Sequence, residues 1–347
     1  MNHITETVVS IGIDLGDLVS HYACLSDTGE IVEAGTVEMK PAKVRRQFAG
    51  FEATRIAIEA GAQSRWVDQV LRELGHEVFV ANPRQVKLIT SSDRKNDSND
   101  AALLARLARV DPSLLSLLQH RSDKEQVTLT GIRARAQLVK MRTAAMLSLR
   151  GMVKCFGVRL PQATSESFLE RCRQAVPERL RAALNPLLEI VAALSAQIEA
   201  CEELLEKTVR QQYPEVTKLS GIYGVGTITG LTFVATLGDP RRFAKSRDVG
   251  AYLGLRPRQR QSGSQNPQLR ITKAGDTYLR SLLVQCAHAV LRANAPDTAL
   301  RRWGLKLCER GGKNAKKRAI VAVARKLAVL LQRMWVTGET YRPFPAN

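Results

Sequence analysis

The sequence predicts an α/β N-terminal domain, an α-helical coiled-coil connector and a mainly α-helical C-terminal domain. Short β-branched runs separated by turn residues occupy residues 8–82, a pattern that indicates strands. Long segments with few helix breakers follow, which indicates helices. Basic residues are concentrated in the last third of the chain. We therefore expect domains over residues 1–115, 116–212 and 213–347.

The N-terminal domain is predicted to begin with an antiparallel meander of three strands joined by tight turns. A further strand, an amphipathic helix and a last strand follow. The predicted elements are, in order, the strands 8–16, 21–25, 31–39 and 55–61, the helix 64–74 and the strand 77–82. The expected order of elements is therefore β-β-β-β-α-β.

Two of these strands carry an acid near their ends, Asp14 in the first and Glu59 in the fourth. An unpaired carboxylate in a core costs several kcal/mol. No Lys or Arg is adjacent to Asp14 in the sequence, and the cations nearest Glu59 are Arg55 and Arg65. Both acids therefore need a positive partner from elsewhere.

Asp97 and Asp100 begin a helix-like segment for which Ser98 or Asn99 is the expected N-cap. Their spacing places both carboxylates on one face of the first turn. They could simply offset the helix dipole, for about 0.3–1 kcal/mol each. They could also hold a metal together with the two strand acids, because oxygen-only ligation favours Mg²⁺ or Mn²⁺. Two such ions can stabilise the attacking and leaving oxygens of a phosphodiester displacement.

The charge of the chain is unevenly distributed. The whole chain has 52 Lys and Arg against 33 Asp and Glu, a net of +19. Residues 213–347 contribute 24 basic and 7 acidic residues, a net of +17. Such an excess predicts a nucleic-acid partner. No apolar run approaches the roughly 20 residues that span a bilayer, so we expect no membrane partner.

The cysteines and the N-terminus favour a cytoplasmic protein. The six cysteines are scattered, without a CxxC pair or a His spacing suited to zinc, as expected of reduced core cysteines. The N-terminus lacks the basic flank and uninterrupted apolar stretch of a signal peptide.

The connector contains an apolar heptad pattern. Its members recur at alternating spacings of four and three residues and are Leu187, Val191, Leu194, Ile198, Cys201 and Leu205. This pattern predicts an antiparallel or dimeric coiled coil that serves in assembly. An ordinary amphipathic helix on a core is the alternative.

The basic third opens with a glycine-rich segment, residues 219–230, that resembles a helix-hairpin-helix. Its turn could direct backbone N–H groups at a phosphate, or could be purely structural. Further cations are predicted to contact nucleic-acid phosphates without reading sequence. They are Arg256, Arg258, Arg260, Arg270, Lys273, Lys313, Lys316, Lys317 and Arg318.

The basic loop also holds Ser262, which precedes Gly263. A serine hydroxyl among guanidinium groups could attack a phosphodiester whose charge those groups stabilise. By itself, Ser-Gly in a loop usually forms only a turn. Ser264 is the nearest competitor for the same role.

The segments 11–14, 58–60 and 95–101 resemble the Asp-Glu-Asp-Asp set of RuvC-like nucleases with the ribonuclease H fold. More narrowly, they resemble the DEDD insertion-sequence transposases, the IS one-ten family with its IS eleven-eleven branch. Residues 243–287 resemble the C-terminal transposase domain of that family, in which a nucleophilic serine precedes a glycine. Ser262 matches that serine.

This resemblance implies a prokaryotic, nucleoid-associated DNA transposase or recombinase. It implies Mg²⁺, or Mn²⁺, at Asp14, Glu59, Asp97 and Asp100, and a transient Ser262–DNA bond. The implied partners are donor and target DNA, an element-encoded bridge RNA, and further copies of the chain in a dimer or tetramer.

Two alternative functions are also compatible with the sequence. A metal-dependent junction-resolving nuclease would need the four acids without Ser262. A non-catalytic nucleic-acid-binding scaffold would need only the basic third.

Overall fold

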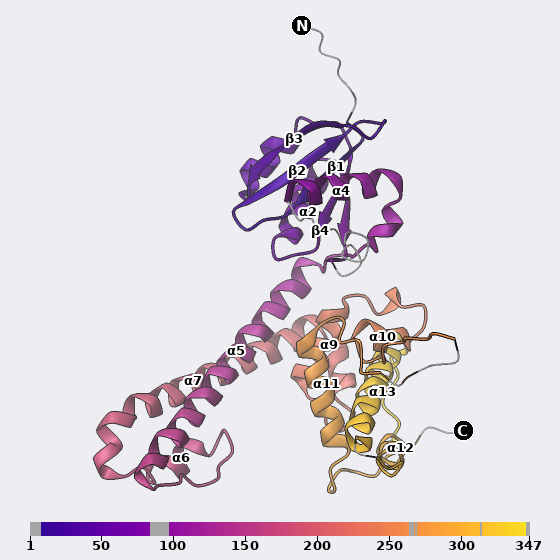
Figure 1. Cartoon of the computed structure of the whole chain (residues 1–347). Helices are drawn as coiled ribbons and strands as arrows, with labels where there is room; N and C mark the ends of the chain where they lie inside the picture. Colours follow the sequence, from indigo (N-terminus) through magenta and orange to yellow (C-terminus); the bar gives the residue numbers. More distant parts are fainter. Residues whose placement is uncertain (1–7, 84–96, 264–266, 268, 313, 345–347) are drawn as a thin grey trace. The chain divides into compact units, whose positions relative to one another are not determined.

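The computed structural model describes residues 8–83, 97–263, 267, 269–312 and 314–344. The chain divides into two compact units, residues 1–120 and 121–347 (Figure 1). The predicted basic domain and all but residues 116–120 of the predicted connector thus fall within one unit. Ser264, Lys313 and the first residues of the segment 95–101 lie outside the described residues.

The first unit is built on a five-stranded mixed sheet in the order β3-β2-β1-β4-β5. Its strands are β1 (Ser10–Asp14), β2 (Val19–Leu25), β3 (Ile31–Glu38), β4 (Arg55–Glu59) and β5 (Glu77–Ala81). The first three form the predicted antiparallel meander, whereas β4 and β5 run parallel to β1. This topology confirms the expected ribonuclease-H-like fold.

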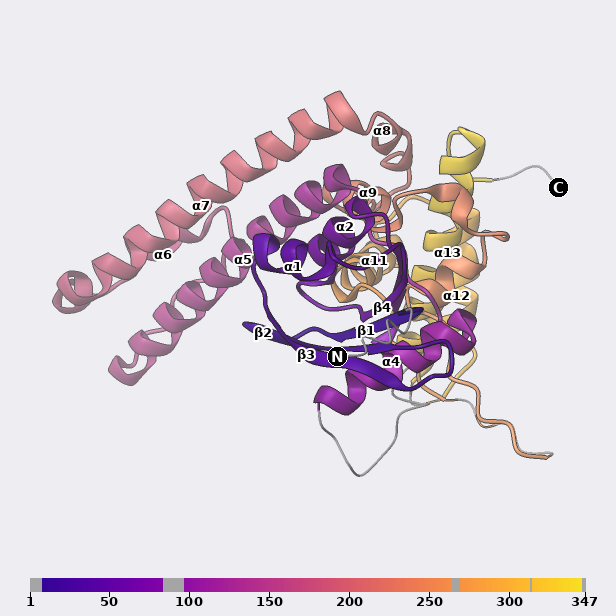
Figure 2. The same ribbon diagram turned by 90° about the horizontal axis from the view of Figure 1, so that it is seen from above.

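Helices cover both faces of this sheet (Figure 2). One face packs against α1 (Pro41–Phe48) and α2 (Ser64–Glu73) through the apolar residues that alternate along the strands. The other face packs against α4 (Asp97–Val110), which is followed by the 3₁₀ helix η1 (Pro112–Leu115). The sequence did not reveal α1, a short helix in which only Val44 and Phe48 are buried.

The start of α4 differs from the prediction. The helix begins at Asp97, so Ser98 and Asn99 lie inside its first turn, and the expected N-cap at either residue is wrong. A cap precedes the first helical residue. The residues immediately before Asp97 lie outside the described part of the chain.

The second unit begins with a helical hairpin. Its helices are α5 (Asp123–Met152), η2 (Val153–Phe156), α6 (Phe168–Arg173) and α7 (Glu178–Gln212). The side chain of Arg135 pairs with Glu202, and Lys124 Nζ donates to the carbonyl of Gln212 over 2.8 Å. Residues early in α5 thus meet residues late in α7, so the two helices are antiparallel and the heptad residues face a helix of the same chain.

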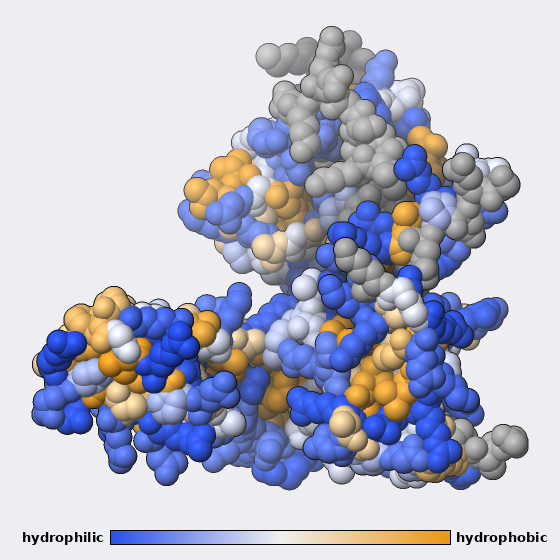
Figure 3. Space-filling model, turned by 60° about the horizontal axis from the view of Figure 1, so that its bottom comes forward, coloured by the Kyte–Doolittle hydropathy of each residue, from blue (hydrophilic) through white to orange (hydrophobic). Residues whose placement is uncertain are grey.

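The heptad pattern corresponds closely to the buried stripe of α7. Val191, Leu194, Ile198 and Leu205 are buried, whereas Leu187 and Cys201 are half-buried. Other apolar side chains of the hairpin are exposed, among them Leu147 and Leu204, and Figure 3 shows orange patches on this arm. By length and composition α7 would be long and apolar enough to cross a membrane, but its buried residues pack within the hairpin and, at Leu205 and Val209, in the core of the helical domain.

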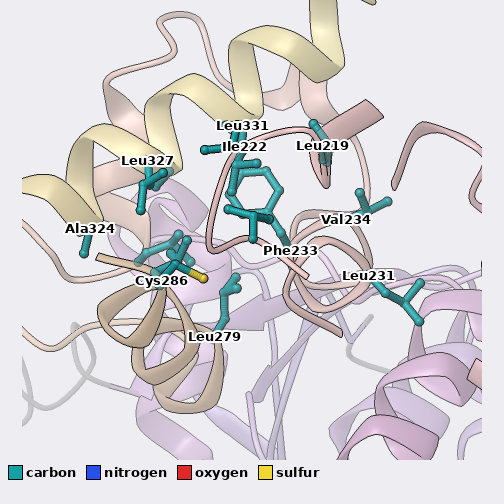
Figure 4. Packing of buried hydrophobic residues seen from close by; sticks show 14 of the residues in the cluster. Leu219, Ile222, Leu231, Phe233, Val234, Leu279, Cys286, Ala324, Leu327 and Leu331 are labelled. Carbon is teal, nitrogen blue, oxygen red and sulfur yellow. The ribbon is translucent and has the colours of Figure 1, made fainter. Parts of the chain in front are cut away.

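The rest of the second unit is a helical domain around one apolar core (Figure 4). Its helices are α8 (Glu215–Leu219), α9 (Thr227–Leu237), η3 (Pro240–Arg242), α10 (Asp248–Tyr252), α11 (Thr277–Val290), α12 (Ala299–Cys308) and α13 (Ala315–Thr337). Phe233 of α9, Leu279 of α11 and Leu327 of α13 are fully buried in this core.

The glycine-rich segment forms the turn between α8 and α9, as expected of two helices joined by a hairpin. Gly224 has a φ of +86°, and a Cβ there would stand 3.1 Å from the carbonyl oxygen of Cys286. Close packing against α11 therefore accounts for this glycine.

Candidate functional site

The four acids singled out in the sequence belong to the first unit. Asp14 is the last residue of β1 and Glu59 the last residue of β4, its parallel neighbour. Ile13 is in register with Ile58, so the two acids follow at the same end of adjacent strands. Because side chains alternate along a strand, both acids lie on the face opposite the buried isoleucines, which is the face covered by α4.

The position of α4 is fixed by Gly12, which lies on the same face of β1 as Asp14. A Cβ on Gly12 would stand 2.0 Å from the carbonyl oxygen of Ala101. Only glycine therefore allows the first turns of α4 to rest on the strand. This contact brings Asp97 and Asp100, in the first turn of the helix, toward Asp14.

The pKa of Asp14 indicates that the four acids lie close together. The pKa of Asp14 is raised to about 6, chiefly by burial and then by the negative charges of Asp97, Asp100 and Glu59, while His21 opposes the rise. Each of the three other acids thus lies close enough to act on Asp14. Capping alone would not require an acid at the ends of two strands beside the helix start.

His21 is a member of this cluster that the sequence did not reveal. It is paired with Asp14 across β1 and β2, and its Nε2 lies 4.0 Å from Oδ2 of Asp97. The predicted strands did not indicate this pairing, because it depends on the register between β1 and β2, which the structure sets with residues 15–18 as the connection.

The donor set fits a hard divalent cation, since carboxylate oxygens are the ligands that Mg²⁺ and Mn²⁺ prefer. The crowding of acids around Asp14 also fits, because a cation would relieve their repulsion. Within the described ranges, however, no group of three or more His, Cys, Asp or Glu side chains is already arranged to hold a metal ion. The side chain of Asp97 is 75% exposed, so packing does not fix it.

Ser262 lies in the second unit, on an exposed loop between α10 and α11. The neighbouring Gly263 has a φ of +55°, which favours glycine. Arg256, Arg258 and Arg260 are exposed on the same stretch of loop. The hydroxyl is thus accessible and lies in a positively charged segment.

Comparison with known proteins identifies the chain. A family model described as a transposase matches residues 11–156, and a model of the transposase IS116/IS110/IS902 family matches residues 216–301. Over 88% of its length the chain is 33% identical to a "Probable family 20 transposase" of Pseudomonas aeruginosa, of which 91% is covered. Over 96% of its length it is 30% identical to the transposase for insertion sequence element IS1111A of Coxiella burnetii, of which 91% is covered.

The chain belongs to the IS110/IS1111 family of insertion-sequence transposases. A transposase is an enzyme that cleaves and joins DNA strands. The transposase is also 28% identical, over 74% of its length, to the pilin gene-inverting protein of Moraxella lacunata, of which 71% is covered. The first matched region of the transposase contains all four acids, and the second contains Ser262.

The loop between α10 and α11 of the transposase carries Ser262 and is called the serine loop below. Its base is closed by backbone hydrogen bonds. Arg258 N donates to the carbonyl of Arg270 over 2.9 Å, and Thr272 N donates to the carbonyl of Arg256 over 2.9 Å. A Cβ on Gly254 would stand 2.2 Å from the amide nitrogen of Ala274, so the two arms of the loop meet at a glycine.

Arg280 of α11 holds this base from within the core. It is 8% exposed, and its Nη1 donates to the carbonyls of Leu253, over 3.2 Å, and of Ala274, over 2.7 Å. Leu253 lies where the chain enters the loop and Ala274 lies where the chain leaves it. This role could not be predicted, because in the sequence Arg280 is one of many cations in the basic third.

The cations predicted to contact nucleic acid occupy two regions of the transposase. Those of the serine loop and its exit are exposed, and Lys273 has a φ of +57°. Those at the start of α13 are also exposed, namely Lys316, Lys317 and Arg318. All lie in the described part of the second unit except Lys313.

Proposed function

We propose that this transposase cuts and rejoins donor and target DNA, with Asp14, Glu59, Asp97 and Asp100 binding Mg²⁺ or Mn²⁺ and Ser262 forming a transient bond to DNA. The observation that supports the acidic half is the raised pKa of Asp14, to which the other three acids contribute. The exposure of Ser262 within a basic loop supports the other half.

The proposed roles follow from the chemistry of the groups. A divalent cation, when bound, stabilises negative charge on the reacting phosphate oxygens. The two strand acids are held by the sheet, while the two helix acids arrive with α4, so Gly12 positions one pair against the other. The guanidinium groups of the loop hold the phosphate by charge-assisted hydrogen bonds.

The proposed cutting step forms a bond between Ser262 Oγ and the phosphorus and breaks the P–O bond to one strand end. The serine loses its proton, and the departing deoxyribose oxygen gains one. In rejoining, the hydroxyl of a strand end attacks the same phosphorus and loses its proton. The serine oxygen then leaves and is protonated again.

The proposal extends to organisation and partners. It includes the division into residues 1–115, 116–212 and 213–347, a cytoplasmic, nucleoid-associated location, guidance by a bridge RNA, and assembly into a dimer or tetramer. The net charge of +17 after residue 212 supports an RNA partner as well as DNA. Sequencing the RNA that co-purifies with the protein, and measuring the mass of the particle in solution, test the last two points.

The central experiment compares Asp14→Asn, Ser262→Ala and the wild-type transposase on element-end DNA with Mg²⁺. Covalent protein–DNA adducts are detected on denaturing gels, and cut strands on sequencing gels. We expect Ser262→Ala to abolish adduct and product while DNA binding survives. We expect Asp14→Asn to abolish adduct and product as well. Ser281→Ala, at an exposed serine of α11, is the matched control and should react normally.

The same experiment separates the alternatives. A junction-resolving nuclease would cut normally without the Ser262 hydroxyl and would form no adduct. A non-catalytic scaffold would cut with none of the proteins. Either result would overturn the proposed function.

A further inference from the structure

A hollow of about 740 Å³ lies between the C-terminal end of α11 and the first turns of α13. It belongs to the second unit and does not include the serine loop. The lining residues are Gln285, His288, Leu291, Arg292, Ala293, Lys316 and Ile320. The hollow thus combines an apolar floor with a polar rim.

The floor is fixed by packing. Ile320 is 6% exposed and belongs to the apolar core, against which Leu291 also packs. A Cβ on Gly304 would stand 2.7 Å from Cδ2 of Leu291, so α12 holds that leucine in place from behind. The hollow is therefore part of the folded structure.

The rim is also held in place. Arg301 Nη2 donates to the carbonyls of Arg292, over 3.3 Å, and of Ala293, over 3.2 Å. The carbonyl of Arg292 also accepts from the backbone N–H of Ala295 over 3.2 Å, so the turn that follows α11 is held by several hydrogen bonds. The segment that carries Arg292 therefore has a defined backbone.

The charge of the rim points to an anion. Arg292, Lys316 and His288 are exposed and line the hollow, and no acid is among its lining residues. Among the described ion pairs, none involves Arg292 or Lys316. Guanidinium and ammonium groups in this arrangement suit phosphate oxygens.

The size of the hollow indicates more than a phosphate. Its volume is in the range of sites for small organic ligands, roughly 300–1,000 Å³. A planar base could lie on the apolar floor and stack against an imidazole or guanidinium plane. The amide of Gln285 could hydrogen-bond to the edge of that base. A base that is stacked and paired in a duplex could not enter.

We propose that this hollow binds one unpaired nucleotide of a nucleic-acid strand, with the base on Leu291 and Ile320 and its phosphates at Arg292 and Lys316. The proposal rests on the nucleic-acid binding assigned to the basic third and is independent of the chemistry of Ser262. The strand could be DNA or RNA, since the shared chemistry is a free base beside phosphates.

The test uses the full-length transposase and a labelled short duplex with a single bulged nucleotide, prepared as DNA and as RNA. In each, the bulged position carries either its base or an abasic sugar, and affinity is measured by fluorescence anisotropy. We expect the base to tighten binding at least about fivefold in one arm, as stacking of one base would. The probe type, DNA or RNA, in which the base tightens binding more identifies the kind of strand that the hollow binds.

Ala293→Phe is the decisive variant because it fills the hollow at an exposed position and leaves every charge in place. It should remove the preference for the base while binding to the fully paired duplex is unchanged. Ala182→Phe, at an exposed position of α7, is the matched control and should retain the preference. Arg292→Gln should weaken binding of the bulged duplex more than Arg210→Gln, which removes the same charge from α7.

Equal affinity for the base-containing and abasic probes in both arms, or no binding of either, would overturn the proposal. So would a preference that survives in Ala293→Phe. The Ser262→Ala protein should keep the preference while losing covalent adducts, so failure of the hollow and failure of the proposed strand chemistry give different results.

Discussion

Gly12 of β1 lies directly beneath Ala101 of α4, so that a Cβ on the glycine would stand 2.0 Å from the carbonyl oxygen of the alanine. The amide nitrogen of Ala105 would be only 2.4 Å away. Since Asp14 is two residues further along the same face of the strand, one close contact sets both the packing of the helix and the distance between the two pairs of acids.

Replacing Gly12 with alanine should therefore harm stability and activity together. The clash is with helix backbone and cannot be relieved by turning a side chain, so we expect a loss of about 1–3 kcal/mol or more in the free energy of unfolding. Thermal and urea unfolding measure it. Gly50→Ala, where a Cβ meets nothing within 4 Å, is the control. An alanine variant as stable as wild type would disprove the contact.

The raised pKa of Asp14 predicts a pH dependence of stability in metal-free buffer. The folded protein holds this proton up to about pH 6, whereas the unfolded chain releases it near 3.8. Between these values the folded state binds more protons, so this group's contribution to stability falls as the pH rises through the window. Above it, Asp14→Asn should be more stable than wild type. Urea unfolding at several pH values in the presence of a chelator measures the difference. Glu203→Gln, at an exposed position of α7, is the control.

If the four acids bind divalent cations, these cations should offset the stability that the protein loses when Asp14 is ionised. At neutral pH, Mg²⁺ or Mn²⁺ at about 100 times its Kd should stabilise the wild-type protein by about 2.7 kcal/mol. The gain should be much smaller in Asp14→Asn and in Glu59→Gln. Differential scanning calorimetry with and without the cation measures the gain. An equal increase in all three proteins would place the cation elsewhere.

Arg280 should govern the order of the serine loop. Arg280→Met removes the donors to the carbonyls of Leu253 and Ala274, so we expect faster tryptic cleavage in the loop and fewer Ser262 adducts. Arg280→Lys should rescue only in part, because one ammonium replaces a planar group that reaches both carbonyls. Arg333→Met, at an exposed position of α13, is the control. Unchanged loop cleavage in Arg280→Met would refute this role.

The cations at the start of α13 should contribute to binding through salt-dependent contacts. If Lys317 neutralises one phosphate of duplex DNA, Lys317→Gln should lower the slope of log K against log salt by about 0.9. Lys207→Gln, which removes the same charge from α7, should leave the slope unchanged. Titrations at several salt concentrations decide between the two results.

Much of the first unit could be predicted because its strands are short runs rich in apolar and β-branched residues, bounded by turn residues. The helix α1 could not, because it buries only Val44 and Phe48 and its remaining residues are polar or small. The start of α4 was misplaced because Asp97, Ser98 and Asn99 are all acceptable near a helix N-terminus, so local preference alone does not choose between them.

The candidate site could be predicted only where residue type and position were both unusual. Asp14 and Glu59 stood out because acids rarely end buried strands. His21 did not, since its relation to Asp14 depends on strand register. The hollow beside Arg292 could not be predicted either, because it forms between α11 and α13, and the role of Arg280 could not, because it depends on the path of the chain around the loop.

The antiparallel hairpin of α5 and α7 has a consequence for how this part of the protein can vary. Its helices contain 30 and 35 residues, or about 45 and 52 Å at 1.5 Å per residue. The bond from Lys124 to Gln212 shows that the chain departs and returns at one place. Matched whole turns could therefore be deleted from, or inserted into, the two helices near α6, so natural variants and engineered versions can differ in reach while the globular part keeps its fold.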